Sequence, residues 1–463
     1  MADTTKLAMR SERPVLRHSS LKGGSFIQDH QQYKPTPPIT QNITDVLLTA
    51  GDNTFHNANP ISPDPEKVTE SGIVHSIFPK SPNPLPAGTT KLVATIFYKS
   101  GSPHHHANSF SAEGGVLPSP VVPVGSAPTV DIEKLPREPP APEPEPLDHL
   151  YGPFVSQLCL THFLQILESL HTPYQRMNTS HRCLDQDDQP RVVEVTLSPL
   201  PNPEYLSFGD LRKHENIWRF EREWNVEVVL QKESIFRRYK RLVVFDMDST
   251  LIQNETIDEI AKFIGVEKEV SAITERAMNG ELDFTASLKA RVSLLKGVPA
   301  DVFDKLQKIV TISPGARELC KALKALGFKM AVLSGGFQPL AEWLANELGL
   351  DYAFANHLAV DESTKTLTGD LVESKPIIDA QQKRTLLRRL AADNNIPLTQ
   401  TIAVGDGAND LPMLHEAELG IAWRAKSKVQ LEAPTRLNGE RLTDILYLLG
   451  LGDEEIKELE STY

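Results

Sequence analysis

One stretch of the sequence limits the folds open to this chain more than any other. The apolar run Leu242–Phe245 is typical of a buried strand in a parallel sheet, and it ends at two aspartates one residue apart, Asp246 and Asp248. Because parallel strands place ligand sites at their carboxyl ends, we expect both carboxylates at the floor of a pocket. Two carboxylates this close repel each other unless a cation lies between them. An ordinary polar turn is the alternative explanation.

The pattern that follows Asp248 predicts how this strand is built into a domain. Helical spacing recurs over about 255–312, which predicts a small helical cap inserted after the first strand. Strand and helix patterns then alternate to about residue 451, with the last short strand expected at Gly420–Ala422. Such alternation predicts an α/β domain over 237–451, with a doubly wound parallel sheet. We expect residues 452–463 to be a tail.

The amino-terminal half has a different character. Residues 1–88 are rich in polar residues and proline without periodicity, which predicts a disordered segment. Over 89–236 the predicted order is β-α-β-β-α-β, with a proline-rich insertion at about 99–149 after the first strand. That order is typical of an α+β ferredoxin-like domain and resembles an ACT-type ligand-binding domain. Such a domain would hold serine or another amino acid, and a homodimer is one way to complete its site. A structural domain that binds nothing is the alternative.

Composition excludes several classes of function. The formal net charge of −13 argues against a broad basic face for nucleic acid. The sequence contains no apolar run long enough to cross a membrane. Its three cysteines lack metal-site or disulfide spacing, which fits a reducing, cytoplasmic setting.

Three further clusters fall where strands end or helices begin. Ser334-Gly335-Gly336 offers a hydroxyl and backbone N–H groups to an anion, although it also suits an ordinary turn. Lys383 lies on a helix with three arginines, so a solvated basic face is an equal alternative. The loop Gly405–Asp410 brings Asp406 and Asp410 to a strand end, and a second pair of acids favours a hard cation bound by oxygen.

Together these clusters resemble the phosphoserine phosphatases of the haloacid dehalogenase superfamily. The resemblance spans about 237–433. It rests on the motifs at 246–250, 254–261, 274–284, 333–337, 379–381 and 404–413.

The resemblance implies a catalytic role for each cluster. Asp246 would be the nucleophile that forms an aspartyl-phosphate, and Asp248 the general acid and base. Mg²⁺ would be held by Asp246, Asp406 and the backbone carbonyl of Asp248, with Asp410 in support. Ser334, the Gly335 N–H and Lys383 would hold the phosphate oxygens. Asn409, also a candidate substrate-binding residue, would orient the metal shell together with Asp410.

The resemblance also implies how the cap selects the substrate. Glu255 would meet the ammonium group of phosphoserine, and Arg291 its carboxylate. Met278 and Phe284 would close an apolar lid. Without the resemblance, Glu255 and Arg291 would be interpreted as exposed helix charges.

The sequence therefore predicts a Mg²⁺-dependent enzyme that hydrolyses O-phospho-L-serine, the last step of phosphorylated serine biosynthesis. Two alternatives stay open: a phosphatase of the same superfamily for another small phosphomonoester, and a regulatory amino-acid-binding protein.

Overall fold

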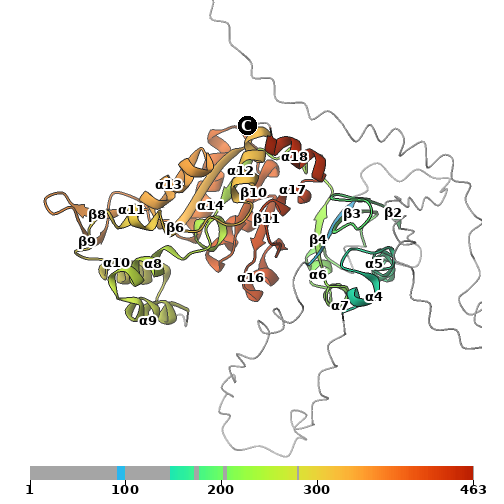
Figure 1. Ribbon diagram of the computed structural model, residues 1–463, viewed down its shortest axis with the longest axis horizontal. Coiled ribbons are helices and arrows are strands. Elements are labelled where there is room, and N and C mark those ends of the chain that lie inside the picture. Colours follow the sequence, from blue (N-terminus) through green and yellow to red (C-terminus); the bar gives the residue numbers. More distant parts are fainter. Residues whose placement is uncertain (1–90, 100–145, 172–176, 202–205, 279–280, 462–463) are drawn as a thin grey trace, which may run out of the picture.

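A computed structural model describes residues 91–99, 146–171, 177–201, 206–278 and 281–461 of the chain (Figure 1). The predictions made for residues 1–88 and for the proline-rich insertion up to residue 145 lie outside these ranges. Within them, no helix is long and apolar enough to cross a membrane.

The described residues between Leu92 and Lys232 form a four-stranded antiparallel sheet with helices. Its strands run β2-β3-β1-β4 across the sheet, with the helices on one face. The apolar residues of β1 that face these helices, Leu92, Ala94 and Ile96, pack in one buried cluster with Phe163 and Phe220. This is the predicted ferredoxin-like arrangement. Its elements are β1 (Leu92–Tyr98), α4 (Asp148–Tyr151), α5 (Gln157–Ser169), β2 (Asn178–Cys183), β3 (Val192–Ser198), α6 (Phe208–Arg212), α7 (Glu215–Glu223) and β4 (Val226–Lys232).

The second sheet has six parallel strands in the order β12-β11-β10-β5-β6-β7. In chain order this is a doubly wound sheet, and the direction of winding reverses between β5 and β10. Apolar clusters cover both faces, as expected for strands that are buried throughout. The strands are β5 (Leu242–Phe245), β6 (Lys329–Phe337), β7 (Tyr352–Asn356), β10 (Thr401–Gly405), β11 (Leu419–Trp423) and β12 (Thr435–Leu437).

The helices around this sheet include one that the sequence did not reveal. Residues 452–463, expected only as a tail, contain α18, which buries Ile456 and Leu459. The last strand was also missed: β12 follows Gly420–Ala422, because three residues are too few to show an alternation. The helices are α12 (Ala316–Ala325), α13 (Gln338–Leu348), α14 (Ala380–Asp393), α15 (Leu411–Glu416), α16 (Ser427–Glu432), α17 (Asp444–Leu448) and α18 (Asp453–Ser461).

A helical cap stands between β5 and β6, as predicted. The chain enters and leaves it side by side, since Ile252 and Ile312 form an antiparallel bridge. A hairpin of β8 (Leu358–Asp361) and β9 (Thr366–Leu371) packs against the cap, and Gly297 N donates to the Leu367 carbonyl at 2.8 Å. The cap lies at the opposite end of the molecule from the antiparallel sheet (Figure 1). Its helices are α8 (Thr256–Ile264), α9 (Glu267–Met278), α10 (Phe284–Ser293) and α11 (Val302–Leu306).

The two sheets are joined by contacts between residues that are far apart in sequence. The Arg237 guanidinium donates to Glu194 at 2.6 Å and to the Leu448 carbonyl at 2.9 Å. Arg182 binds the other oxygen of Glu194 and also the carbonyl of Gly450. Arg237 and Glu194 are both buried, so this junction is a fixed part of the structure.

Candidate active site

Asp246 is the first residue after β5 and is buried. Its Oδ1 accepts hydrogen bonds from the Met247 backbone N–H and from Lys383 Nζ, each at 2.7 Å. The chain then makes a tight turn, with Ser249 at a φ of 54°. That turn directs Asp248 back over the same edge of the sheet, so both predicted aspartates lie at the switch point between β5 and β10.

Lys383 is not part of a solvated basic face. Its side chain points inward from α14, is fully buried, and forms ion pairs with Asp246 and Asp410 at 2.7 Å each. The neighbouring arginines do face outward, where Arg384 and Arg388 pair with Glu416. One buried ammonium thus joins the strand-end aspartate of β5 to the loop after β10.

The loop after β10 supplies two more carboxylates. Asp410 Oδ2 accepts the Gly407 N–H at 3.0 Å, which folds the loop back on itself. Gly405 permits this fold, because a Cβ there would lie 2.5 Å from the Asp410 carboxyl carbon. Carboxylate oxygens of Asp246, Asp406 and Asp410 lie within 4.8 Å of one another, a candidate metal site of hard oxygen ligands.

The charges of this site do not balance without a further cation. Three carboxylates face one ammonium, and burial with the neighbouring charge of Asp246 raises the pKa of Asp406 to about 7. Burial and Asp246 also raise the pKa of Asp410, although Lys383 opposes the shift. Burial alone would lower the pKa of Lys383, but Asp246 and Asp410 raise it. The surplus negative charge and the oxygen ligands both suit a divalent metal ion.

The Ser334-Gly335-Gly336 segment ends β6 beside Asp248. Ser334 is fully buried, and its Oγ accepts the Gly336 N–H at 2.8 Å. A Cβ on Gly336 would lie 2.9 Å from Asp248 Oδ2 and 3.0 Å from Ser334 Oγ, so only glycine fits between them. The structure therefore brings the hydroxyl and the second aspartate together across one glycine.

Asp248 is held by a residue that the sequence analysis did not single out. Its Oδ1 accepts hydrogen bonds from both the hydroxyl and the backbone N–H of Thr256, the first residue of α8. Burial raises the pKa of Asp248 to about 8, and the charges of Glu255 and Asp246 add to the shift, while the bonds from Thr256 oppose it. The first cap helix thus orients this carboxyl group.

Thr250 and Ser249 are two further side chains that the sequence analysis missed. Thr250 Oγ1 donates to Asp406 at 3.1 Å, and Ser249 Oγ donates to Glu255 at 2.7 Å. The Ser-Thr pair directly after Asp248 was the available signal.

Two of the predicted cap residues, Phe284 and Arg291, lie near the site. The Phe284 ring lies over Gly335, 3.4 Å from where a Cβ would stand. Burial lowers the pKa of Arg291, and the charges of Asp258 and Glu255 oppose that shift, which places Arg291 near both acids. The side chain of Met278, the remaining predicted lid residue, lies outside the described part. Outside the cap, Asn409 is half-buried in the loop after β10.

Comparison with known proteins agrees with this geometry. Residues 240–418 match the family profile of haloacid dehalogenase-like hydrolases. The chain is 48% identical over 235 residues to a probable phosphoserine phosphatase of Schizosaccharomyces pombe, covering 51% of this chain and 78% of the relative. It is 48% identical over 233 residues to the phosphoserine phosphatase of Saccharomyces cerevisiae, covering 50% of this chain and 74% of the relative.

A solved structure supports the same assignment. The HAD family hydrolase from Salmonella enterica subsp. enterica serovar Typhi superimposes with a TM-score of 0.52 at 33% identity, covering 63% of this chain and 96% of that one. The matched residues 240–418 include the strands β5, β6, β7 and β10, the inserted cap and the carboxylate cluster of Asp246, Asp406 and Asp410. The chain therefore belongs to the phosphoserine phosphatase family of haloacid dehalogenase-like hydrolases.

Proposed function

We propose that this protein hydrolyses O-phospho-L-serine to L-serine and phosphate through an aspartyl-phosphate intermediate, with Mg²⁺ as its metal. The observation that carries the proposal is the buried contact of Lys383 with both Asp246 and Asp410 beside Asp406. This arrangement would hold the Asp246 carboxylate in position to attack phosphorus, next to a metal site made of carboxylate oxygens. In a cell the reaction would be the last step of phosphorylated serine biosynthesis.

Asp246 is the nucleophile in this proposal. Lys383 and the Met247 N–H both bind Oδ1, which orients the other oxygen toward phosphorus. Attack forms the bond between that oxygen and phosphorus and breaks the bond between phosphorus and the serine oxygen. Fixing the carboxylate before the substrate arrives lowers the entropic cost of reaching the transition state.

Asp248 is the general acid and then the general base. The leaving serine alkoxide is strongly basic, so a proton donor at that oxygen is worth roughly 10²–10⁴-fold in rate. A pKa raised to about 8 keeps the carboxyl group protonated at neutral pH for the first step. In the second step the deprotonated group takes a proton from the water that hydrolyses the phosphoenzyme.

The residues that would hold Mg²⁺ are Asp246, Asp406 and the backbone carbonyl of Asp248, with Asp410 in support. When bound, the ion neutralises negative charge between the carboxylates and the phosphate. Ser334, the Gly335 N–H and Lys383 would bind the remaining phosphate oxygens, and Asn409 would help Asp410 to orient the metal ligands.

The cap would select the amino-acid part of the substrate. Glu255 would bind the ammonium group and Arg291 the carboxylate, with Asp258 close to both. The Phe284 ring, which already lies over Gly335, would cover the phosphate site together with Met278. Closing an apolar cover excludes water and strengthens the electrostatic contacts inside.

We further infer two functional units, 89–236 and 237–451, in a cytoplasmic protein whose three cysteines are free thiols. An amino-acid ligand for the first unit, and a homodimer that completes its site, stay as predictions. Calorimetry with L-serine and light scattering on the full chain test them.

A phosphate-release assay with L-phosphoserine, a panel of other small phosphomonoesters and Mg²⁺ tests the main proposal. We expect turnover with phosphoserine to exceed that with the other esters. Turnover confined to another ester would favour the broader phosphatase alternative, and no turnover would favour a regulatory protein. Asp246→Asn should abolish both turnover and phosphoenzyme, since an amide is not a nucleophile; residual turnover, with deamidation excluded, would refute the covalent route.

A further inference from the structure

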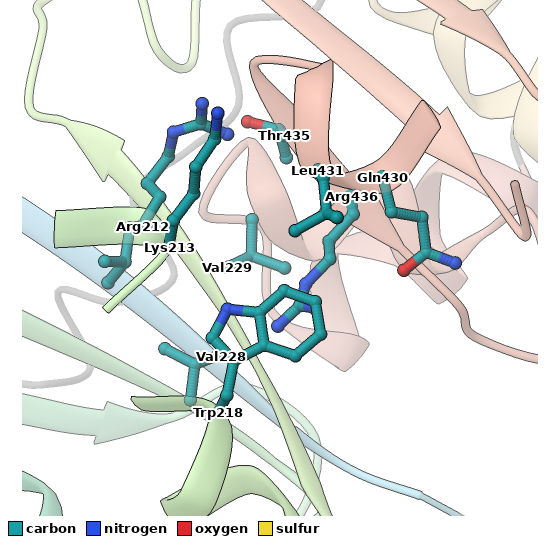
Figure 2. A pocket seen from close by; sticks show the side chains of 10 residues that line it. Arg212, Lys213, Trp218, Val228, Val229, Gln430, Leu431, Thr435 and Arg436 are labelled. Atoms are coloured by element: carbon teal, nitrogen blue, oxygen red, sulfur yellow. The ribbon is translucent and has the colours of Figure 1, made fainter. Parts of the chain in front are cut away.

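A pocket lies where the antiparallel sheet meets the far edge of the parallel sheet (Figure 2). One wall comes from α6, α7 and β4, and the other from α16 and β12. The strand β12 is separated from β10 by β11, so the pocket is distinct from the site around Asp246. Its polar lining residues are Arg212, Lys213, Trp218, Gln430, Thr435 and Arg436.

The three cationic side chains of this pocket differ in how they are neutralised. Arg436 is fully engaged, since it pairs with the buried Glu221 and stacks on the Trp218 ring with 4.1 Å from guanidinium to centroid. Among the residues that the structure describes, Arg212 donates only to the Ala433 carbonyl, at 2.8 Å. Lys213 has no acidic partner among the described residues. Two positive charges in this pocket therefore lack a counter-charge from the described part of the chain.

Arg212 also lies close enough to Arg436 for the two guanidinium groups to repel each other. Burial lowers the pKa of Arg212, and the positive charge of Arg436 adds to the shift. An anion beside Arg212 would oppose this shift, because an opposite charge favours the protonated guanidinium. Such a positive pocket is notable in a chain whose formal net charge is −13.

The remaining polar lining residues are Thr435, Trp218 and Gln430, and the Gln430 amide already bonds Ala425 and Asn438. Figure 2 shows the Thr435 hydroxyl at the same end of the pocket as the heads of Arg212 and Lys213. The Trp218 Nε1–H, in the wall, has no hydrogen-bond partner in the described part of the chain. Glu221, the acid beside Arg436, already receives Arg436 and the Val228 N–H, so it does not neutralise the other cations.

We propose that this pocket binds a small oxyanion, the phosphate group or carboxylate of a metabolite-sized ligand, between the heads of Arg212 and Lys213 and the Thr435 hydroxyl. A planar guanidinium and a hydroxyl donate to oxyanions at favourable geometry, and an ammonium adds a point charge. Two unneutralised cations favour a dianion such as phosphate over a single carboxylate.

A ligand there would contact both structural units. Arg212 and Lys213 belong to the antiparallel-sheet unit, while Thr435 belongs to β12 of the catalytic unit. Binding would thus stabilise the junction by an amount that grows with the logarithm of the ligand concentration above the dissociation constant. This is a site additional to the proposed catalytic one.

Titration calorimetry on the full chain tests the proposal with inorganic phosphate, with acetate, and with chloride at matched ionic strength. The active site can also bind phosphate, so the comparison is between wild type and the double variant Arg212→Gln/Lys213→Gln. We expect the variant to lose one phosphate site or to bind there at least about tenfold more weakly, because charge-assisted bonds are removed. Thr435→Val should weaken the same site by a smaller factor.

The matched control is Arg219→Gln/Lys232→Gln, which removes the same charges from the same unit outside the pocket. Phosphoserine turnover in chloride buffer should be unchanged in both double variants, which separates this proposal from the catalytic one. Loss of an acetate site alone would assign the ligand class as carboxylate. Identical phosphate and acetate titrations for wild type and the pocket variant, or equal weakening in the control, would overturn the proposal.

Discussion

Replacing Lys383 by methionine is the most direct test of how the site is assembled. Methionine keeps the length of the side chain but removes the charge. Lys383 is fully buried and makes 2.7 Å ion pairs with Asp246 and Asp410. The variant would leave two buried carboxylates facing each other and Asp406, without the only ammonium that contacts them in the described structure.

The expected loss of stability follows from those contacts. Removing one partner of a buried ion pair costs about 3–5 kcal/mol, because the other charge stays buried without compensation. For a domain of this size, about 1 kcal/mol moves the melting temperature by roughly 2–4 °C. We therefore expect Lys383→Met to melt roughly 6–20 °C below wild type in EDTA at pH 8.

The difference in melting temperature between wild type and Lys383→Met should depend on pH and on metal. Without the lysine, the folded state holds its carboxyl protons to higher pH than the unfolded state, so stability falls as pH rises. The deficit should thus be larger at pH 8 than at pH 6. A divalent cation replaces part of the missing charge, so Mg²⁺ should narrow the deficit.

Thermal unfolding followed by circular dichroism, in EDTA and in Mg²⁺ at both pH values, measures these differences. Lys308→Met, at an exposed lysine of the cap, is the control for replacing lysine by methionine. A melting temperature for Lys383→Met equal to that of the control in EDTA at pH 8 would refute the reasoning. The variant should also lose turnover, but the stability result stands independently of activity.

Four further outcomes are expected. Arg291→Ala should lower kcat/KM for phosphoserine about tenfold to hundredfold while sparing an aryl phosphate, because one charge-assisted carboxylate contact is lost; equal losses would place Arg291 outside the substrate site. Thr256→Val should reduce turnover of phosphoserine more than of an aryl phosphate, whose better leaving group needs less help from Asp248; the ratio of the two rates measures this. The rate should decline as pH rises through about 8, where Asp248 loses its proton, and a flat pH–rate profile to pH 9 would contradict that role. Apparent Mg²⁺ affinity, measured by calorimetry, should increase as pH rises through about 7, since the metal displaces the proton of Asp406.

The parts of the fold that the sequence predicted are those set by local pattern. The doubly wound sheet, the cap after β5 and the β-α-β-β-α-β order followed from periodicity and chain order. The sequence also predicted that Asp246 and Asp406 lie close together, because the carboxyl ends of neighbouring parallel strands meet at one edge of the sheet.

The parts that were missed depend on tertiary placement. Thr256 contacts Asp248 only because the cap returns over the β5 strand end, and no local pattern encodes that return. Lys383 was ambiguous for the same reason: its helix has outward arginines, and only the packed structure shows which side faces Asp410. The contact of Arg237 with the Leu448 carbonyl joins residues 211 positions apart, where spacing carries no signal.

The junction between the two sheets sets an order for events during synthesis of the chain. Arg182 donates to the Gly450 carbonyl across 268 positions, and the Leu184 carbonyl accepts the Asp453 N–H. The antiparallel sheet is therefore translated long before its docking surface exists. At about 5–20 residues per second, that interval is roughly 15–50 s on the ribosome. During this time Phe97, Val192 and Val229 lack the described residues of the catalytic unit that later pack against them. We therefore expect a chaperone to matter most while the amino-terminal unit is folded and the catalytic unit is still being synthesised.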